Sequence, residues 1–210
     1  MSQNVEKKET VIRLDEQEAV SDPLVQFSNW YEEELRLKGN HPEAMTLATA
    51  TSQGIPSARM VLLKGFDPQG FLFFTNYLSR KGREIKVNPH AAIVFHWPQN
   101  RRQVRIEGGV KKLPFEISVK YFRSRPFDHQ IAALLSAQSE PLSSRQALDE
   151  RFAALMKKHE GQEVPMPIHW GGYQLKPTCF EFWQWQPSQL HDRLLYTKKG
   201  DAWNIQRLAP

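Results

Sequence analysis

The chain has 210 residues, a length that suits one domain with a sizeable hydrophobic core. Its composition is ordinary for a globular protein, with 40% hydrophobic and 24% charged residues, and no apolar run is long enough to predict a membrane span. The residues from Met1 to Glu9 are polar, so we expect no secretory signal, and the single cysteine cannot form an internal disulfide. These features predict a cytoplasmic protein.

The formal net charge of +5 favours anionic partners. A phosphate-bearing small molecule and a nucleic acid both satisfy a surplus of this size. A basic barrel that binds nucleic acid would stack bases on Phe and Trp side chains. The cations of this chain, however, fall at scattered turns and at one helix start, without a continuous basic stripe. Their distribution favours the small molecule, so we expect neither a nucleic-acid partner nor a membrane partner.

The first twenty residues show no hydrophobic periodicity, which predicts a mobile N-terminal arm over 1–20 and a folded domain over 21–210. Ser21-Asp22-Pro23 is typical of a helix start, and apolar residues at helical spacing follow it as far as Gly39-Asn40. Period-two patterns then predict an antiparallel meander, with strands over 45–51, 57–64 and 71–76.

In the rest of the chain, segments with helical spacing of apolar residues and segments with period-two spacing both occur. A short helix is expected over 79–88, and further helical segments over 114–123, 127–137 and 143–160. Further strands are expected over 91–97, 102–113, 173–185, 190–196 and 203–208. With about eight strands and no βαβ alternation, the chain predicts a mainly β fold with peripheral helices (α+β), an antiparallel barrel.

Ser79-Arg80-Lys81 places two cations and a capping hydroxyl at a helix start, where free backbone N–H groups also gather. A phosphate would be held well there. The alternative is that these basic side chains are only solvated, although their charge then opposes the helix dipole.

Two further pairs of side chains have an equally open interpretation. Tyr121 and Arg125 lie four residues apart, so on a helix they form either a phosphate clamp or a surface stacking pair. Arg59 and Lys64 lie five apart on a strand, which directs them to opposite faces unless a bulge intervenes.

The segment from Glu181 to Arg193 is the densest group of aromatic and polar residues. Trp183 could cover a flat ring system, and His191 suits proton handling near neutral pH. The alternative is a barrel strand with aromatic packing and a surface cluster of charges. The seven histidines and the lone Cys179 show no metal-ligand spacing, so we expect no metal.

From about residue 21 to its end, the chain resembles the pyridoxine/pyridoxamine 5'-phosphate oxidase family. The resemblance rests on segments in the family's order and spacing: Ser57-Ala-Arg-Met-Val-Leu-Leu-Lys64, Phe73-Phe-Thr-Asn76, Ser79-Arg-Lys81, Arg102-Gln-Val-Arg105, Tyr121-Phe-Arg-Ser-Arg-Pro126, Gln138-Ser139, Trp170-Gly-Gly172, Glu181-Phe-Trp-Gln184, Leu190-His-Asp-Arg193 and Arg207-Leu-Ala-Pro210. Together they form a highly specific pattern.

The resemblance implies a split-barrel flavoprotein that works as a homodimer, with FMN bound at the subunit interface. The positions that match the family's FMN site are Arg59, Met60, Val61, Leu62, Leu63, Lys64, Phe74, Thr75, Arg80, Lys81, Gln103, Gln138, Ser139, Trp183 and Arg193. Arg80 and Lys81 are expected to hold the FMN phosphate, in agreement with the anion site suggested by the helix start.

The family activity is oxidation of pyridoxamine or pyridoxine 5'-phosphate to pyridoxal 5'-phosphate, with hydride transfer from the substrate C4' carbon to flavin N5 and reoxidation by O2 to H2O2. The positions that match its substrate site are Lys64, Tyr121, Arg125, His129, Gln189 and His191. Of these, Gln189 and His191 are expected to flank the reacting ring.

The departures from the family pattern lie on the substrate side. His129 stands where the family has a serine, Gln189 where it has an arginine, and Trp185 where it usually has a glycine. The N-terminal arm also lacks the family's Arg-x-x-Tyr segment. Three alternatives follow: a working phosphate oxidase with local compensation, the same oxidase retuned for another amine or alcohol, and a flavin-binding protein without catalysis.

Overall fold

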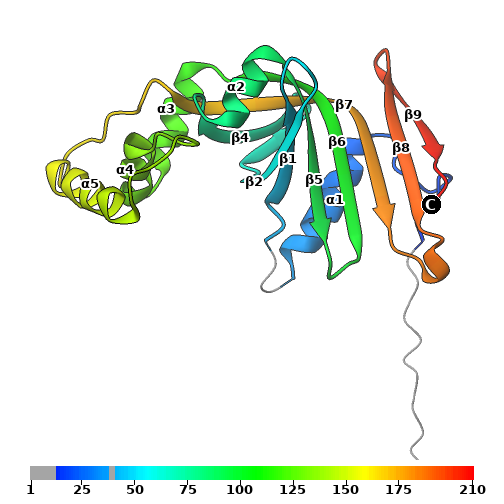
Figure 1. Cartoon of the computed structure of the whole chain (residues 1–210). Coiled ribbons are helices and arrows are strands. Elements are labelled where there is room, and N and C mark those ends of the chain that lie inside the picture. Colours follow the sequence, from blue (N-terminus) through cyan, green and yellow to red (C-terminus); the bar gives the residue numbers. More distant parts are fainter. Residues whose placement is uncertain (1–12, 38–40) are drawn as a thin grey trace, which may run out of the picture. The chain divides into compact units, whose positions relative to one another are not determined.

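The structure of the chain, a computed structural model, describes residues 13–37 and 41–210 (Figure 1). Within them the helices are α1 (Pro23–Leu35), α2 (Arg80–Val87), α3 (Phe115–Ser124), α4 (Phe127–Leu135) and α5 (Arg145–Lys158), and one short 3₁₀ turn covers Pro187–Gln189. None of the described helices is long and apolar enough to cross a membrane.

Nine strands occur in the described residues: β1 (Ala44–Ala50), β2 (Pro56–Leu62), β3 (Gly65–Asp67), β4 (Gly70–Asn76), β5 (His90–Trp97), β6 (Arg102–Lys112), β7 (Trp170–Gln184), β8 (Asp192–Lys199) and β9 (Ala202–Arg207). Their order in the sheet is β2-β1-β5-β6-β7-β4-β3, and β8 pairs with both β7 and β9. The pairs with a defined register, such as β1 with β2 and β4 with β7, are antiparallel. The expected mainly β, antiparallel fold with added helices is therefore confirmed.

The chain divides into two compact units. We call residues 1–42, 94–106 and 179–210 the terminal unit, and residues 43–93 and 107–178 the pocket unit. Of the expected arm over 1–20, the described residues 13–20 belong to the terminal unit, and residues 1–12 lie outside the described part of the chain.

The terminal unit is built around the apolar face of α1. Asp22 caps this helix by accepting a hydrogen bond from Leu24 N at 2.8 Å, and Pro23 opens its first turn. Phe27 lies 5.0 Å from Phe95 between ring centroids, and Trp30 meets Phe182 edge to face at 5.2 Å. Burial of such rings gives this unit its own core.

The described residues before α1 contact the C-terminal strands β8 and β9. Leu14 is buried, and its N–H donates to the Asp192 carboxylate at 3.1 Å. Arg207 forms ion pairs with Asp192 and with Glu16. The described end of the expected arm therefore has defined contacts with β8 and β9.

The pocket unit combines the β1–β2 hairpin, the β4–β7 ladder and helices α2 to α5. Its helical part has a separate apolar cluster formed by Phe122, Ile131, Ala133, Val164 and Trp170. In the ladder, Phe74 pairs with Gly172, where an added Cβ would come within 2.8 Å of the Phe74 ring. Glycine at this position therefore lets the aromatic ring lie flat against the neighbouring strand.

The sequence prediction was incomplete in two places. It missed β3, because a three-residue strand beside the Asp67-Pro68 turn is too short to show a period. It also began a strand at residue 173, whereas β7 begins at Trp170 and includes Gly171-Gly172. Within β6, position 108 needs a glycine because a Cβ there would lie 2.0 Å from the carbonyl oxygen of Lys176.

Candidate functional site

A cavity of about 470 Å³ in the pocket unit brings together most of the residues that the sequence singled out. This volume falls in the range of small-molecule sites. Its lining includes the expected cofactor residues Met60, Val61, Leu62, Lys64, Phe74, Thr75, Lys81 and Gln138, and the expected substrate residues Tyr121, Arg125 and His129. Sequence reasoning did not name the other lining residues, Asn76, Ala132, Ala133, Ser136 and Trp170, as site residues.

Strand β2 and the residues after it supply one wall of this cavity. Met60 and Leu62 are exposed apolar side chains, while Leu63 is buried in the core and does not line the cavity. Lys64 follows the end of β2, and its N–H donates to Leu72 O at 2.8 Å. Because Lys64 lies outside the regular strand, the alternation that would direct it away from Arg59 does not apply to it.

Stacked aromatic rings form a second wall. The Phe74 and Tyr121 rings stack with centroids 3.9 Å apart, and Trp170 lies 5.6 Å from Phe74. The Arg125 guanidinium lies 4.8 Å above the Trp170 ring, and its buried Nη1 has no hydrogen-bond partner among the described residues. A buried donor without a partner is costly, so it is a natural place for an anionic ligand oxygen.

Helix α3 ends at Ser124, so Arg125 is not on the same continuous helix as Tyr121. Both side chains nevertheless line the cavity. Burial lowers the pKa of Arg125, an effect opposed by the nearby Tyr121 and Asp128. Tyr121 stacks on Phe74 and Arg125 lies over Trp170, so the two do not form a surface stacking pair with each other, and the phosphate clamp stays a prediction.

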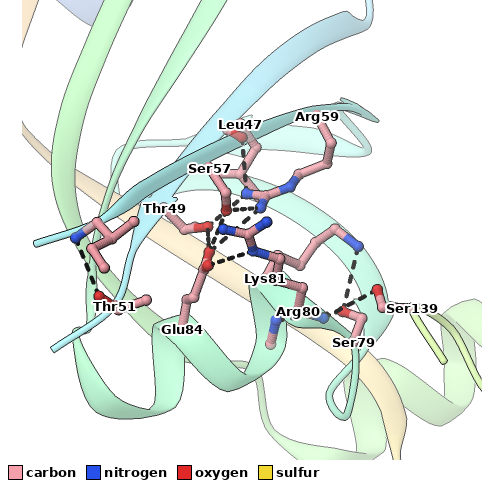
Figure 2. A network of polar contacts seen from close by, with 12 residues as sticks. Leu47, Thr49, Thr51, Ser57, Arg59, Ser79, Arg80, Lys81, Glu84 and Ser139 are labelled. Carbon is pink, nitrogen blue, oxygen red and sulfur yellow. Dashed lines mark hydrogen bonds and ion pairs between the residues drawn. The ribbon is translucent and has the colours of Figure 1, made fainter. Parts of the chain in front are cut away.

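The N-terminus of α2 forms the third part of the site. Ser79 caps the helix by accepting a hydrogen bond from Gly82 N, and Arg80 N donates to Ser139 Oγ at 3.2 Å (Figure 2). The Lys81 ammonium is buried and donates to Gln138 Oε1 at 2.9 Å and to Thr75 Oγ1 at 3.3 Å. Ser139 and Gln138 therefore contact the helix start from a distant part of the sequence.

Lys81 is a buried cation whose described partners are all neutral. Burial lowers its pKa to about 8, and the positive charge of Arg59 contributes to the same shift. A charged group in this position lacks a counterion. The donors at this helix start therefore fit a phosphate group, although Arg59, Arg80 and Ser139 are not in the cavity lining.

The terminal unit holds the remaining expected residues. His191 lies 4.7 Å from Trp183 and 6.5 Å from Trp185 between ring centroids, and the Arg101 guanidinium stacks 4.4 Å from the Trp185 ring centre. Arg193 forms an ion pair with Glu181 at 3.0 Å. Gln103 lies on β6 of the same unit and is partly exposed.

Hydrogen bonds to both ring nitrogens fix the tautomer of His191. The backbone N–H of Gln186 donates to Nδ1 at 3.1 Å, so Nδ1 carries no proton. Nε2 then holds the proton and donates it to Gln189 Oε1 at 3.1 Å. An arginine at position 189 has no acceptor atom and could not make this second bond.

The described residues contain no group of three or more His, Cys, Asp or Glu side chains arranged to hold a metal ion. The side chains that line the cavity of the pocket unit and those that surround His191 include cations, aromatic rings, amides and imidazoles. The pocket unit offers anion and ring binding, while the terminal unit offers a flat aromatic surface beside a proton donor.

Comparisons with known proteins agree along almost the whole chain. A family model described as pyridoxamine 5'-phosphate oxidase matches residues 31–157, and one described as the pyridoxine 5'-phosphate oxidase C-terminal dimerisation region matches residues 170–210. The chain is 50% identical over 208 residues to a protein of Nostoc sp. named pyridoxine/pyridoxamine 5'-phosphate oxidase, with 99% of this chain and 97% of the relative covered. A Rubrobacter xylanophilus protein of the same name is 50% identical over 197 residues, covering 94% and 91% of the two chains.

Among solved structures, the chain is similar to PhzG from Burkholderia lata 383, determined in complex with tetrahydrophenazine-1-carboxylic acid. The TM-score is 0.89 and the identity 31%, over 95% of this chain and 99% of the other.

Proposed function

Because the chain belongs to the pyridoxamine 5'-phosphate oxidase family, a family of oxidoreductases with a split-barrel fold, we propose that it is an FMN-dependent oxidase. Its proposed substrates are pyridoxamine 5'-phosphate and pyridoxine 5'-phosphate, its product is pyridoxal 5'-phosphate, and its electron acceptor is O2. The observation that carries the proposal is the single cavity that joins the expected cofactor residues to the expected substrate residues.

The cofactor phosphate is proposed to bind at the start of α2. Lys81 supplies a buried positive charge, and Arg80 and Ser139 lie beside the same helix end. Met60, Val61 and Leu62 of β2 and Lys64 after it, together with Phe74, Thr75 and Gln138, then line the space proposed for the flavin ring. The chemistry that FMN supplies when bound is acceptance of a hydride at N5 and transfer of both electrons to O2, which yields H2O2.

The substrate phosphate is proposed to bind between Lys64, Tyr121 and Arg125. The unpartnered Nη1 of Arg125 and the exposed Lys64 supply two positive charges on one side of the cavity. His129, with an exposed side chain in the same lining, replaces the family's serine and can donate to a phosphate oxygen. These contacts fix one end of the substrate and thereby orient its reacting carbon.

The chain is proposed to act as a homodimer with FMN at the interface, supported by the match of residues 170–210 to a dimerisation region. Gln103, Trp183 and Arg193 are proposed to complete the cofactor site, in which Arg80, Lys81, Trp183 and Arg193 converge between two copies. His191 and Gln189 are proposed to meet the substrate ring. In the tautomer described above, His191 presents a proton at Nε2 and therefore acts first as a hydrogen-bond donor.

A second candidate is the same oxidase with its pocket retuned for another amine or alcohol. Gln189 removes a fixed positive charge that an anionic substrate would use, and Trp185, held by Arg101, adds a large ring beside His191. PhzG, at 31% identity, was solved in complex with tetrahydrophenazine-1-carboxylic acid, a ligand without a phosphate group, which supports a change of ligand on a similar scaffold.

The test is oxygen uptake and peroxide release by the purified protein with the two phosphorylated vitamers and a panel of unphosphorylated amines. Gln189→Arg and His129→Ser are measured beside the parent. Turnover of the phosphorylated substrates by the parent supports the main proposal. Turnover of another amine by the parent, together with a gain from the reversions on the phosphorylated substrates, would favour the second candidate, and no gain from either reversion would exclude it. A yellow protein that no substrate bleaches anaerobically would be a flavin binder without catalysis.

A further inference from the structure

Glu84 on α2 lies at the centre of a buried polar network that the proposed function does not use (Figure 2). Its side chain is only 6% exposed. One carboxylate oxygen, Oε2, accepts hydrogen bonds from Thr49 Oγ1 at 2.5 Å and from Ser57 Oγ at 2.6 Å. The two hydroxyls come from the facing strands β1 and β2, so the network ties α2 to this hairpin.

The same carboxylate holds two cations of the expected FMN site: Arg80, expected at the cofactor phosphate, and Arg59, expected beside the flavin. Arg59 Nη2 lies 3.4 Å from Oε2, and Arg80 Nε donates to Oε1 at 2.9 Å. Arg59 is held further by Leu47 O at 3.1 Å and by Thr49 Oγ1 at 2.6 Å. Its guanidinium is therefore fixed on several sides, while Arg80 has only one described side-chain partner, Glu84.

The charges of this group are unbalanced in favour of an anion. Arg59, Arg80 and Lys81 carry three positive charges, and Glu84 is the one carboxylate that contacts them in the described structure. Burial opposes ionisation of Glu84, but hydrogen bonds from Ser57, Thr49 and Arg80 together lower its pKa to about 2. Two positive charges remain in excess, which matches a phosphate monoester of about −1.5 to −2 at neutral pH.

We propose that Glu84 is a positioning residue for the phosphate of the flavin, which sets the Arg59 and Arg80 guanidinium groups in place before the ligand binds. The inference rests on the proposed function, since it concerns the same cofactor. Glu84 does not itself meet the phosphate, because a carboxylate there would repel it. Its contribution is to hold two long, flexible side chains that would otherwise lose conformational entropy on binding.

The variant Glu84→Gln distinguishes two roles of Glu84: positioning of the two arginines, and a direct effect of its negative charge on the bound phosphate. The amide keeps the size of the side chain but loses both charge-assisted contacts to the arginines. Positioning predicts that FMN binds about tenfold more weakly, while riboflavin, which has no phosphate, binds as it does to the parent. Charge balance alone predicts the reverse, because removal of a negative charge beside the site would tighten FMN binding.

Glu140→Gln is the matched control. Glu140 forms an exposed ion pair at 2.6 Å with Arg83, also on α2, so this variant removes one negative charge near the helix without touching the network. It should leave both dissociation constants unchanged. Glu84→Asp keeps the charge but shortens the reach, and it should lose FMN affinity selectively by a smaller factor than Glu84→Gln.

The measurements are quenching of flavin fluorescence for FMN and riboflavin, and thermal unfolding of each apoprotein. If Glu84→Gln does not fold, Glu84→Asp and Ser57→Ala, which removes a hydroxyl shared by Glu84 and Arg59, carry the test in the same way. Equal losses for both flavins, or FMN binding as tight as in the parent, would overturn the inference. A parent that binds no FMN would instead overturn the proposed function.

Discussion

The pocket unit and the terminal unit prepare their functional side chains in different ways. In the pocket unit, Arg59 and Arg80 are held in a network of charges around Glu84, and Lys81 is buried among neutral donors and acceptors. In the terminal unit, His191 lies among aromatic rings and is hydrogen bonded to a backbone N–H and to an amide. The comparison teaches that the cation network around Glu84 and the aromatic cluster around His191 are built separately, so each can change without the other.

The three residues that depart from the family pattern are divided between the two units. Trp185 and Gln189 lie beside His191 in the terminal unit, while His129 lines the cavity of the pocket unit. The residues around the start of α2 show no departure. We expect substitutions at α2 to change cofactor binding and substitutions near His191 to change the choice of substrate.

The largest effect is expected for Lys81→Met, which keeps the apolar stem of the side chain and removes its charge. FMN affinity should fall about a hundredfold, while riboflavin affinity should change little, because only the phosphate uses this charge. Fluorescence titration of both flavins measures the difference. Lys86→Met, an exposed lysine in the last turn of the same helix, is the control and should bind FMN like the parent.

The pH dependence of FMN affinity should come next in size. Lys81 has a pKa lowered to about 8 in the free protein, so it is charged below pH 8 and loses its proton above it. A bound phosphate favours the charged form, and binding above pH 8 must therefore take up a proton. The FMN dissociation constant should rise about tenfold between pH 7 and pH 9.

Riboflavin affinity should not change over this range, and Lys81→Met should lose the pH dependence. The lowered pKa of Lys81 also makes the stability of the free protein depend on pH, with the opposite sign to the FMN affinity. The cost of burying a charged Lys81 is present below pH 8 and is relieved as the pH rises from 8 towards the ordinary value of 10.5. An FMN affinity that stays constant from pH 7 to 9 would contradict a role for the Lys81 charge.

Gln189→Arg should increase kcat/KM for pyridoxamine 5'-phosphate by about fivefold. The arginine adds a positive charge for the substrate and frees Nε2 of His191, because a guanidinium cannot accept its proton. Steady-state oxygen uptake measures the change. Gln162→Arg, which adds the same charge at an exposed position, should have no effect, and an equal gain for both variants would mean that net charge alone is responsible.

Trp185→Gly should have the smallest effect, a shift of about threefold in the ratio of kcat/KM between small and bulky amines. The substitution removes the ring that Arg101 stacks on and opens space beside His191. Competition between two amines in one assay measures the ratio. An unchanged ratio would show that Trp185 only packs against Arg101 and does not select the substrate.

Much of the fold followed from local patterns in the sequence. The helix start at Ser21-Asp22-Pro23 and the cap at Ser79 were both predicted, because each depends on neighbours within a few residues. The interior glycines of β7 were not, because the reason for Gly172 is the Phe74 ring of another strand.

The candidate site divides in the same way. The cluster of cations at the start of α2 could be predicted, since a capped helix start with basic residues is a local signal, and its role as an anion site stays a prediction. Glu84 could not, because a glutamate within a short helix is usually solvated, and its partners Thr49 and Ser57 are 35 and 27 residues away in the chain. Trp170 was missed as a site residue because an aromatic residue at a strand start reads as core.

The central claim is that the start of α2 is built for the phosphate of a flavin. Titration of the parent apoprotein with FMN and with riboflavin tests it most directly. The account predicts one FMN per chain, bound about a hundredfold more tightly than riboflavin. Equal affinity for the two flavins, or no binding of either, would contradict it.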